Sequence, residues 1–215
     1  MGCVGGQRVS SDGFWHDEGV SEDRSASWKA GLIGGPEERD IVLVPYDPRW
    51  PAAFEEQRAR ILGALSSRAK RVEHIGSTAV PGLSAKPIID IQVSVVDLDD
   101  ESAYVPALQD AGYVLRVREP RHRMLRTPAL DVHVHVCTVD SEWERRHLLL
   151  RDWLRRSDSD RARYAEVKAE LGTQSWPTMN HYADAKSSII AEIMKRAERW
   201  AVTGDWPEPG CNDRR

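Results

Sequence analysis

The feature that most constrains the fold is a pair of short apolar segments separated by a loop rich in glycine and proline. Arg71 to Ile75 and Ile88 to Val96 have the composition of strands, and residues 76–87 form the loop between them. A third segment, Leu130 to Val139, alternates polar side chains with Val132, Val134 and Val136. Because successive side chains of a strand point to opposite faces, this alternation predicts a strand with one buried face.

Helical patterns surround these strands. Asp47 and Pro48 predict the N-cap and first turn of a helix that runs to about Ser66. The other predicted elements are the strand Ile41 to Val44, the helix Ser102 to Ala111, the strand Tyr113 to Val117, and three helices over Ser141 to Arg156, Asp158 to Leu171 and Ala183 to Val202. The sequence therefore predicts an α+β fold of α/β-like character, with a mixed sheet flanked by helices and a helical C-terminal third.

The two ends of the chain differ in composition from its middle. Residues 1–38 hold more than half of the 15 glycines and show no periodicity, and residues 204–215 are rich in glycine and proline. Segments of this kind bury too little apolar area to offset their ordering entropy. We expect two disordered tails around one domain at residues 39–203.

Composition narrows the classes of function. The chain is 40% hydrophobic and 30% charged with a formal net charge of −4, which argues against a protein that coats nucleic acid. Its apolar runs are far shorter than the roughly 20 residues that a membrane-spanning helix needs. The first residues do not resemble a secretory signal, and the three cysteines lack paired spacing. We expect a cytoplasmic protein without membrane contact.

The loop and the strand that follows it carry the clearest chemistry. Gly76 allows backbone N–H groups to approach an anion, and the Ser77 and Thr78 hydroxyls can donate to phosphate oxygens. Lys86 can add a charge-assisted contact, and Asp90 can bind Mg²⁺, which is usually held by one or two carboxylates together with phosphates. A tight turn between two strands explains the same residues without any ligand.

Several stretches together resemble the GrpB family over residues 41–202. The matching residues are His74 to Ile91, Val44 to Trp50, His135 and Val136, Trp143, Arg146, Leu148, Arg151 to Arg155, and Tyr164 to Lys168. The resemblance implies a fold of the nucleotidyltransferase superfamily and, in some relatives, fusion to dephospho-coenzyme A kinase. It does not assign a substrate.

The superfamily pattern places a Gly-Ser turn before a strand that carries two acids, and a third acid on a later strand. Gly76, Ser77 and Asp90 match the turn and the first acid. Gln92 stands where the second acid is expected, which removes a metal ligand. Asp131 is the candidate for the third, so the resemblance implies that Asp90 and Asp131 are catalytic and bind Mg²⁺.

Three further groups remain open to two interpretations. His133, His135 and Cys137 share a strand face and are either zinc or iron ligands or the wall of a cleft that contacts nucleotide. The arginines of residues 116–126 suit phosphate, and Arg126 is the candidate among them, although a solvated loop explains the charge as well. Lys186 can reach a phosphate or remain solvated.

These residues support three hypotheses. The first is a Mg²⁺-dependent nucleotidyltransferase that moves a nucleotidyl group from a nucleoside triphosphate to an unidentified small-molecule acceptor. The second is a nucleotide- or coenzyme-binding module that has lost catalysis, which Gln92 favours. The third is a metal-dependent hydrolase built on His133, His135 and Asp131.

Overall fold

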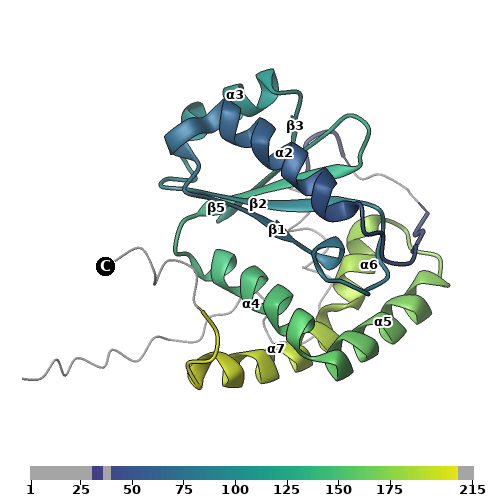
Figure 1. The fold of residues 1–215 in the computed structure, drawn as a ribbon. Helices are drawn as coiled ribbons and strands as arrows, with labels where there is room; N and C mark the ends of the chain where they lie inside the picture. The colour runs from purple at the N-terminus through teal and green to yellow at the C-terminus, as the bar shows by residue number, and fades with distance from the viewer. Residues whose placement is uncertain (1–30, 36–39, 208–215) are drawn as a thin grey trace, which may run out of the picture.

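The computed structural model describes residues 31–35 and 40–207 and has a five-stranded sheet at its centre (Figure 1). The strands are β1 (Arg71–Ile75), β2 (Ile89–Val95), β3 (Val114–Glu119), β4 (His122–Arg126) and β5 (Val132–Thr138). Their order is β1-β2-β5-β4-β3, with β2 and β5 parallel and the other neighbours antiparallel. The predicted mixed sheet and α+β class are therefore confirmed.

One face of the sheet is apolar. Ile91 and Val93 of β2 and Val134 and Val136 of β5 are fully buried, because period-two alternation points them all to the same side. They pack against α2 (Trp50–Leu65) and α3 (Val105–Asp110), which lie together over this face in Figure 1. This layer forms the main hydrophobic core.

The opposite face is polar and lies under the C-terminal third of the chain, which is helical as predicted. The helices are α4 (Glu142–Arg156), α5 (Asp158–Gly172), α6 (Met179–Ala185) and α7 (Ser187–Val202) (Figure 1). Ser141 is the N-cap of α4 and accepts a hydrogen bond from the backbone N–H of Glu144, and Ser157 caps α5. The polar side chains of β2 and β5 are thus enclosed between two layers.

The arginine-rich segment 116–126 is a β-hairpin and not a solvated loop. Strands β3 and β4 turn at Arg121, which has a φ of 66°. Arg118 and Arg123 both bind the carboxylate of Glu101, and Arg123 is only 7% exposed. The local pattern does not predict β4, because the acids that pair with its Arg123, Glu101 and Asp99, lie 22 and 24 residues earlier in the chain.

Four other boundaries differ from the predictions. The first helix begins at Trp50, and Asp47 instead accepts the N–H of Arg49 in the turn before it. The expected strand Ile41 to Val44 reduces to one bridge between Val44 and Ala85, because the segment meets a loop and not a sheet edge. The helix expected from Ser102 begins as the 3₁₀ turn η3 (Glu101–Ala103), and α6 and α7 are separated at Lys186.

Parts of the expected tails belong to the folded unit. Leu32 forms a bridge with Val117 of β3, and Trp206 is 5% exposed and packs on the core between α4 and α7. Leu32 and Trp206 are single apolar residues in polar, glycine- and proline-rich segments, so the composition of these segments does not predict their contacts. Residues 1–30, 36–39 and 208–215 lie outside the described residues. Within residues 31–35 and 40–207, no helix combines the length and apolar character needed to cross a membrane.

Candidate functional site

The loop after β1 is built around one glycine. Gly76 has a φ of 71°, and a Cβ atom at this position would lie 2.5 Å from Oδ2 of Asp90. A side chain is therefore excluded by both the backbone conformation and the neighbouring carboxylate. The close approach brings the 3₁₀ turn η2 (Ser77–Ala79) against the start of β2.

A cavity of about 100 Å³ opens beside this loop. Six of the residues singled out from the sequence line it: Ser77, Thr78, Lys86, Asp90, His133 and Lys186. They come from η2, the loop before β2, strands β2 and β5, and the junction of α6 and α7. The fold thus gathers side chains that lie far apart in the sequence.

Lys168 of α5 is the main cavity residue that the sequence does not single out. It is 3% exposed, and its Nζ donates to Ser77 Oγ at 2.9 Å and to the carbonyl oxygen of Ser84. The available signal is its place at the end of the matching stretch Tyr164 to Lys168. A lysine on an amphipathic helix is otherwise expected to be solvated, and only the docking of α5 shows where it points.

The cavity concentrates positive charge. The Nζ atoms of Lys86 and Lys186 lie 5.3 and 4.7 Å from the centre of the Tyr182 ring. Burial, together with Lys186 and Lys86, lowers the pKa of Lys168 to about 7. Burial and the nearby Lys86 lower the pKa of Lys186 to about 8. Three lysines and one carboxylate line the cavity, so an anion bound there would relieve the repulsion between the lysines.

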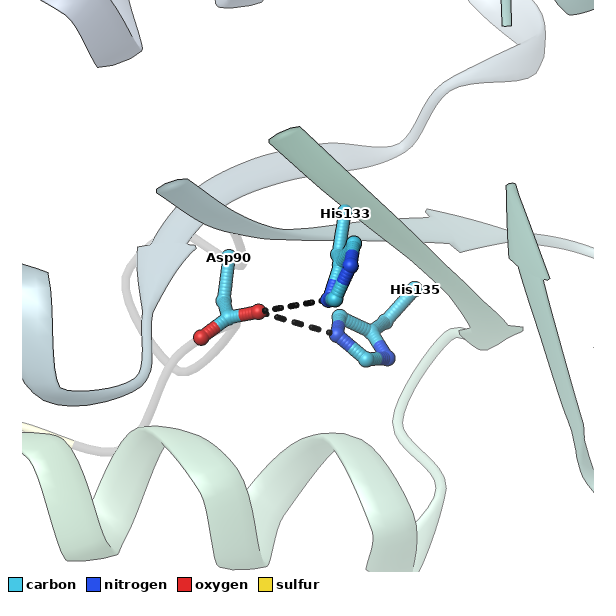
Figure 2. A group of neighbouring side chains, drawn as sticks. All are labelled: Asp90, His133 and His135. Carbon is cyan, nitrogen blue, oxygen red and sulfur yellow. Dashed lines mark hydrogen bonds and ion pairs between the residues drawn. The ribbon is translucent and has the colours of Figure 1, made fainter. Parts of the chain in front are cut away.

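Asp90, His133 and His135 point toward one another on the polar face of the sheet (Figure 2). Asp90 Oδ1 lies 3.4 Å from His133 Nδ1 and 3.4 Å from His135 Nε2. Burial acts to raise the pKa of Asp90, but the neighbouring His133 and His135 rings outweigh it and hold the pKa well below its usual range. One atom from each residue lies within 4.8 Å of the others, which is close enough to hold one metal ion.

A second layer of side chains supports His135. Its Nδ1 lies 3.0 Å from Nε2 of His122, whose Nδ1 lies 3.2 Å from Oε2 of Glu119. The Trp143 ring stacks on His122 at 5.1 Å. The sequence does not indicate His122 or Glu119, because the charged pattern of this hairpin is equally typical of a loop.

Several expected residues have other roles or positions. Asp131 is exposed and accepts a hydrogen bond from Thr127 at 2.6 Å, outside the Asp90 group. Arg126 pairs in register with His133 but does not line the cavity. Thr78 donates its hydroxyl to the carbonyl of Ile88, so Ser77 is the hydroxyl that remains to face a ligand.

Cys137 does not join the histidines. It is fully buried beside Ser94, and burial raises the pKa of its thiol to about 12. A thiol with this pKa is a poor metal ligand, because the ligand is the thiolate. The expected combination of two histidines and Cys137 is therefore replaced by two histidines and Asp90.

Gln92 occupies the position of the missing second acid. It is fully buried in register with His135, and both polar atoms of its amide are without a hydrogen-bond partner among the described residues. The second carboxylate of the superfamily pattern is thus not present beside Asp90. One carboxylate and two imidazoles fit a divalent ion that accepts nitrogen ligands, and they do not fit Mg²⁺.

Several known proteins are similar to this chain. A family model described as GrpB protein matches residues 40–196. A UPF0157 protein of Halalkalibacterium halodurans is 50% identical over 165 residues, covering 75% of this chain and 85% of its own. A UPF0157 protein of Streptomyces coelicolor is 52% identical over 166 residues, covering 77% and 89%.

One solved structure and one larger protein are similar as well. The crystal structure of the conserved protein GrpB from Enterococcus faecalis has a TM-score of 0.66 and 30% identity, over 74% of this chain and 99% of that one. A protein of Mycolicibacterium paratuberculosis named dephospho-CoA kinase is 31% identical over 195 residues, which cover 77% of this chain and 48% of the relative.

Proposed function

This chain belongs to the GrpB family, and we propose that it binds a nucleoside triphosphate in the lysine-lined cavity and transfers the nucleotidyl group to a small-molecule acceptor. The observation that carries the proposal is the convergence of Lys86, Lys168 and Lys186 on one cavity beside Asp90. Preorganised ammonium groups in a partly dehydrated site stabilise charge that develops on phosphate oxygens.

Each side chain has a distinct part in this proposal. Lys168 donates to Ser77 Oγ, which directs the hydroxyl proton of Ser77 away from the ammonium group, so that it can be donated to a phosphate oxygen. Lys86 and Lys186, both held over the Tyr182 ring, face the charge of the leaving pyrophosphate. A divalent cation at Asp90 would add charge neutralisation at the reacting phosphorus. Asp131 and Arg126 have no part in it, since neither lines the cavity.

The name of the relatives called dephospho-CoA kinase gives the proposal limited support, because it connects similar chains with nucleotide chemistry. A second candidate is a nucleotide- or coenzyme-binding module without catalysis. The buried Gln92 favours it, because an amide in place of the second acid removes one metal ligand of the superfamily pattern. The two candidates share the cavity and differ only in whether a bond is broken.

The test has a binding arm and a transfer arm. Thermal unfolding is followed with ATP, CTP, GTP, UTP and coenzyme A precursors, each with and without Mg²⁺ or Mn²⁺. A ligand at about 100 times its Kd stabilises the folded state by about 2.7 kcal/mol. The nucleotide that binds is then supplied with an α-phosphate label, and release of pyrophosphate is measured with candidate acceptors.

Matched lysine variants locate the site. We expect Lys168→Met and Lys186→Met to abolish the stabilisation. Lys195→Met should retain it, because Lys195 is exposed on α7, the helix that begins directly after Lys186. Binding without pyrophosphate release would establish the binding module. If no nucleotide or coenzyme precursor stabilises the protein, both candidates are wrong.

A further inference from the structure

We propose that Asp90, His133 and His135 bind a first-row transition metal ion such as Zn²⁺ or Mn²⁺ in preference to Mg²⁺, with Glu119 and His122 as residues that position His135. The proposal names the ion of the transferase site and in that respect rests on the proposed function. Binding of the ion can nevertheless be measured without any nucleotide, so the two proposals can fail separately.

The hydrogen bonds of His122 determine which ring nitrogens carry protons. A carboxylate only accepts, so His122 donates from Nδ1 to Glu119 at 3.2 Å. With its proton on Nδ1, the His122 ring presents Nε2 as the acceptor. The 3.0 Å contact between the two rings therefore makes Nδ1 of His135 the donor. This chain of bonds fixes the tautomer of His135.

The tautomer has a consequence for the other ring nitrogen. With the proton of the His135 ring on Nδ1, the lone pair of Nε2 is directed at Asp90 Oδ1, which is also an acceptor. Two acceptors facing each other at 3.4 Å repel unless a cation lies between them. The arrangement matches the way in which metal-binding histidines donate their second N–H to a carboxylate or another acceptor.

The spacing of the three groups supports a metal ion over direct hydrogen bonds. Both contacts to Asp90 Oδ1 are 3.4 Å, longer than the usual N–H···O distance of about 2.9 Å. Ligands about 2.0–2.1 Å from a tetrahedral zinc ion are separated from each other by about 3.4 Å. The two distances from Oδ1 to the imidazole nitrogens are thus those between ligands of one ion.

The chemistry of the ligands selects the class of ion. Two imidazoles and one carboxylate suit Zn²⁺, Mn²⁺ and Fe²⁺, whereas Mg²⁺ prefers an octahedron of oxygen atoms. Three protein ligands leave a position open for substrate or water. Asp90 and His133 line the cavity with the lysines, so a phosphate oxygen held there is placed next to that position.

The experiment measures binding of the metal alone. The full chain is freed of metal with EDTA and titrated calorimetrically with Zn²⁺, Mn²⁺ and Mg²⁺ without nucleotide, and Co²⁺ absorption reports the coordination geometry. We expect one ion per chain, with Zn²⁺ or Mn²⁺ bound at least about 100-fold more tightly than Mg²⁺. Because the comparison between ions uses the unaltered protein, it does not depend on the folding of a variant.

Variants then separate the ligands from the residues that position them. His135→Gln and Asp90→Asn should remove binding. Glu119→Gln should weaken it about 10- to 100-fold, as is typical when an outer hydrogen-bond partner of a ligand is lost. Asp131→Asn is the matched control, since this exposed carboxylate lies beside β5 but outside the group, and it should bind metal unchanged.

Two results would overturn the proposal. One is equal affinity for Mg²⁺ and Zn²⁺, and the other is no binding of Zn²⁺ or Mn²⁺, with ¹⁵N chemical shifts that show His135 as an imidazolium paired with Asp90. In either case nucleotide binding by the lysines remains to be judged by its own assay. Metal binding without nucleotide transfer would conversely support this site and contradict the transferase.

Discussion

Replacing Gly76 with alanine tests the close contact on which the geometry of the site depends. The backbone of Gly76 has φ 71° and ψ −170°, a region that is essentially restricted to glycine and costs a side chain about 1–3 kcal/mol. The new Cβ would also lie 2.5 Å from Oδ2 and 3.0 Å from Cβ of Asp90, and overpacking of this kind adds about 1–3 kcal/mol. We expect Gly76→Ala to lower the free energy of unfolding by about 2–6 kcal/mol.

Two other glycines provide matched controls in urea unfolding with EDTA present. Gly82 has a φ of 79° but no heavy atom within 4 Å of an added Cβ atom, so Gly82→Ala should show only the backbone cost of about 1–3 kcal/mol. Gly63 lies inside α2 with open space around it, so Gly63→Ala should stabilise the protein by about 0.5–1 kcal/mol. The slope against urea should stay unchanged in all three.

The double variant Gly76→Ala, Asp90→Ala isolates the contact with the carboxylate. Removing Oδ2 should recover part of the steric cost, which appears as a coupling energy of about 0.5–3 kcal/mol in the double-mutant cycle. The reasoning is refuted if Gly76→Ala destabilises the protein no more than Gly82→Ala, or if the two substitutions at Gly76 and Asp90 are additive.

Three further predictions follow from groups near the site. Gln92→Leu should raise the free energy of unfolding by about 1–3 kcal/mol, because it removes a buried amide without partners among the described residues; a loss of stability in urea would contradict this. Glu144→Ala should lower the free energy of unfolding by about 3–5 kcal/mol, because it removes the carboxylate that lies 2.7 Å from the partly buried Arg71. A loss below about 1 kcal/mol in urea unfolding would show that the ion pair is dispensable. Sulfate has a constant charge over this range and should bind more tightly as the pH falls from about 9 to about 6. The reason is that Lys186 and then Lys168, with pKa values of about 8 and 7, become charged. Calorimetry that finds no pH dependence of sulfate binding would contradict a role for these lysines.

The apolar periodicity of the chain is sufficient to predict most of the fold. Strands β2 and β5 are predictable because their valines and isoleucines face one core, and the C-terminal helices because their apolar residues recur at helical spacing. Strand β4 is not, since arginine and histidine dominate it. Its Arg123 is compensated by Glu101, 22 residues earlier, and by Asp99. Such compensation depends on tertiary contacts that local patterns do not record.

Some residues of the site can likewise be predicted from the sequence, and others cannot. Ser77, Lys86 and Asp90 lie within one short stretch, so their proximity can be predicted without the fold. The contact of Lys168 with Ser77 depends on how α5 packs, and the contact of His122 with His135 depends on the pairing of β4 with β5. No local sequence pattern indicates either contact. The alternation of the strand favours Asp131, but this residue precedes β5 and turns to Thr127. Period-two alternation does not extend reliably past the end of a strand.

The cavity joins two separate layers of the molecule, and this has a mechanical consequence. Asp90 and His133 are fixed to the sheet, whereas Lys168 and Lys186 are carried by the helical layer (Figure 1). A ligand that bridges them would act as a cross-link between the layers, and its binding energy would oppose their separation. Protection of amides in α5 and α7 from hydrogen exchange should therefore rise with ligand occupancy, while the strands, already enclosed by the core, should change little.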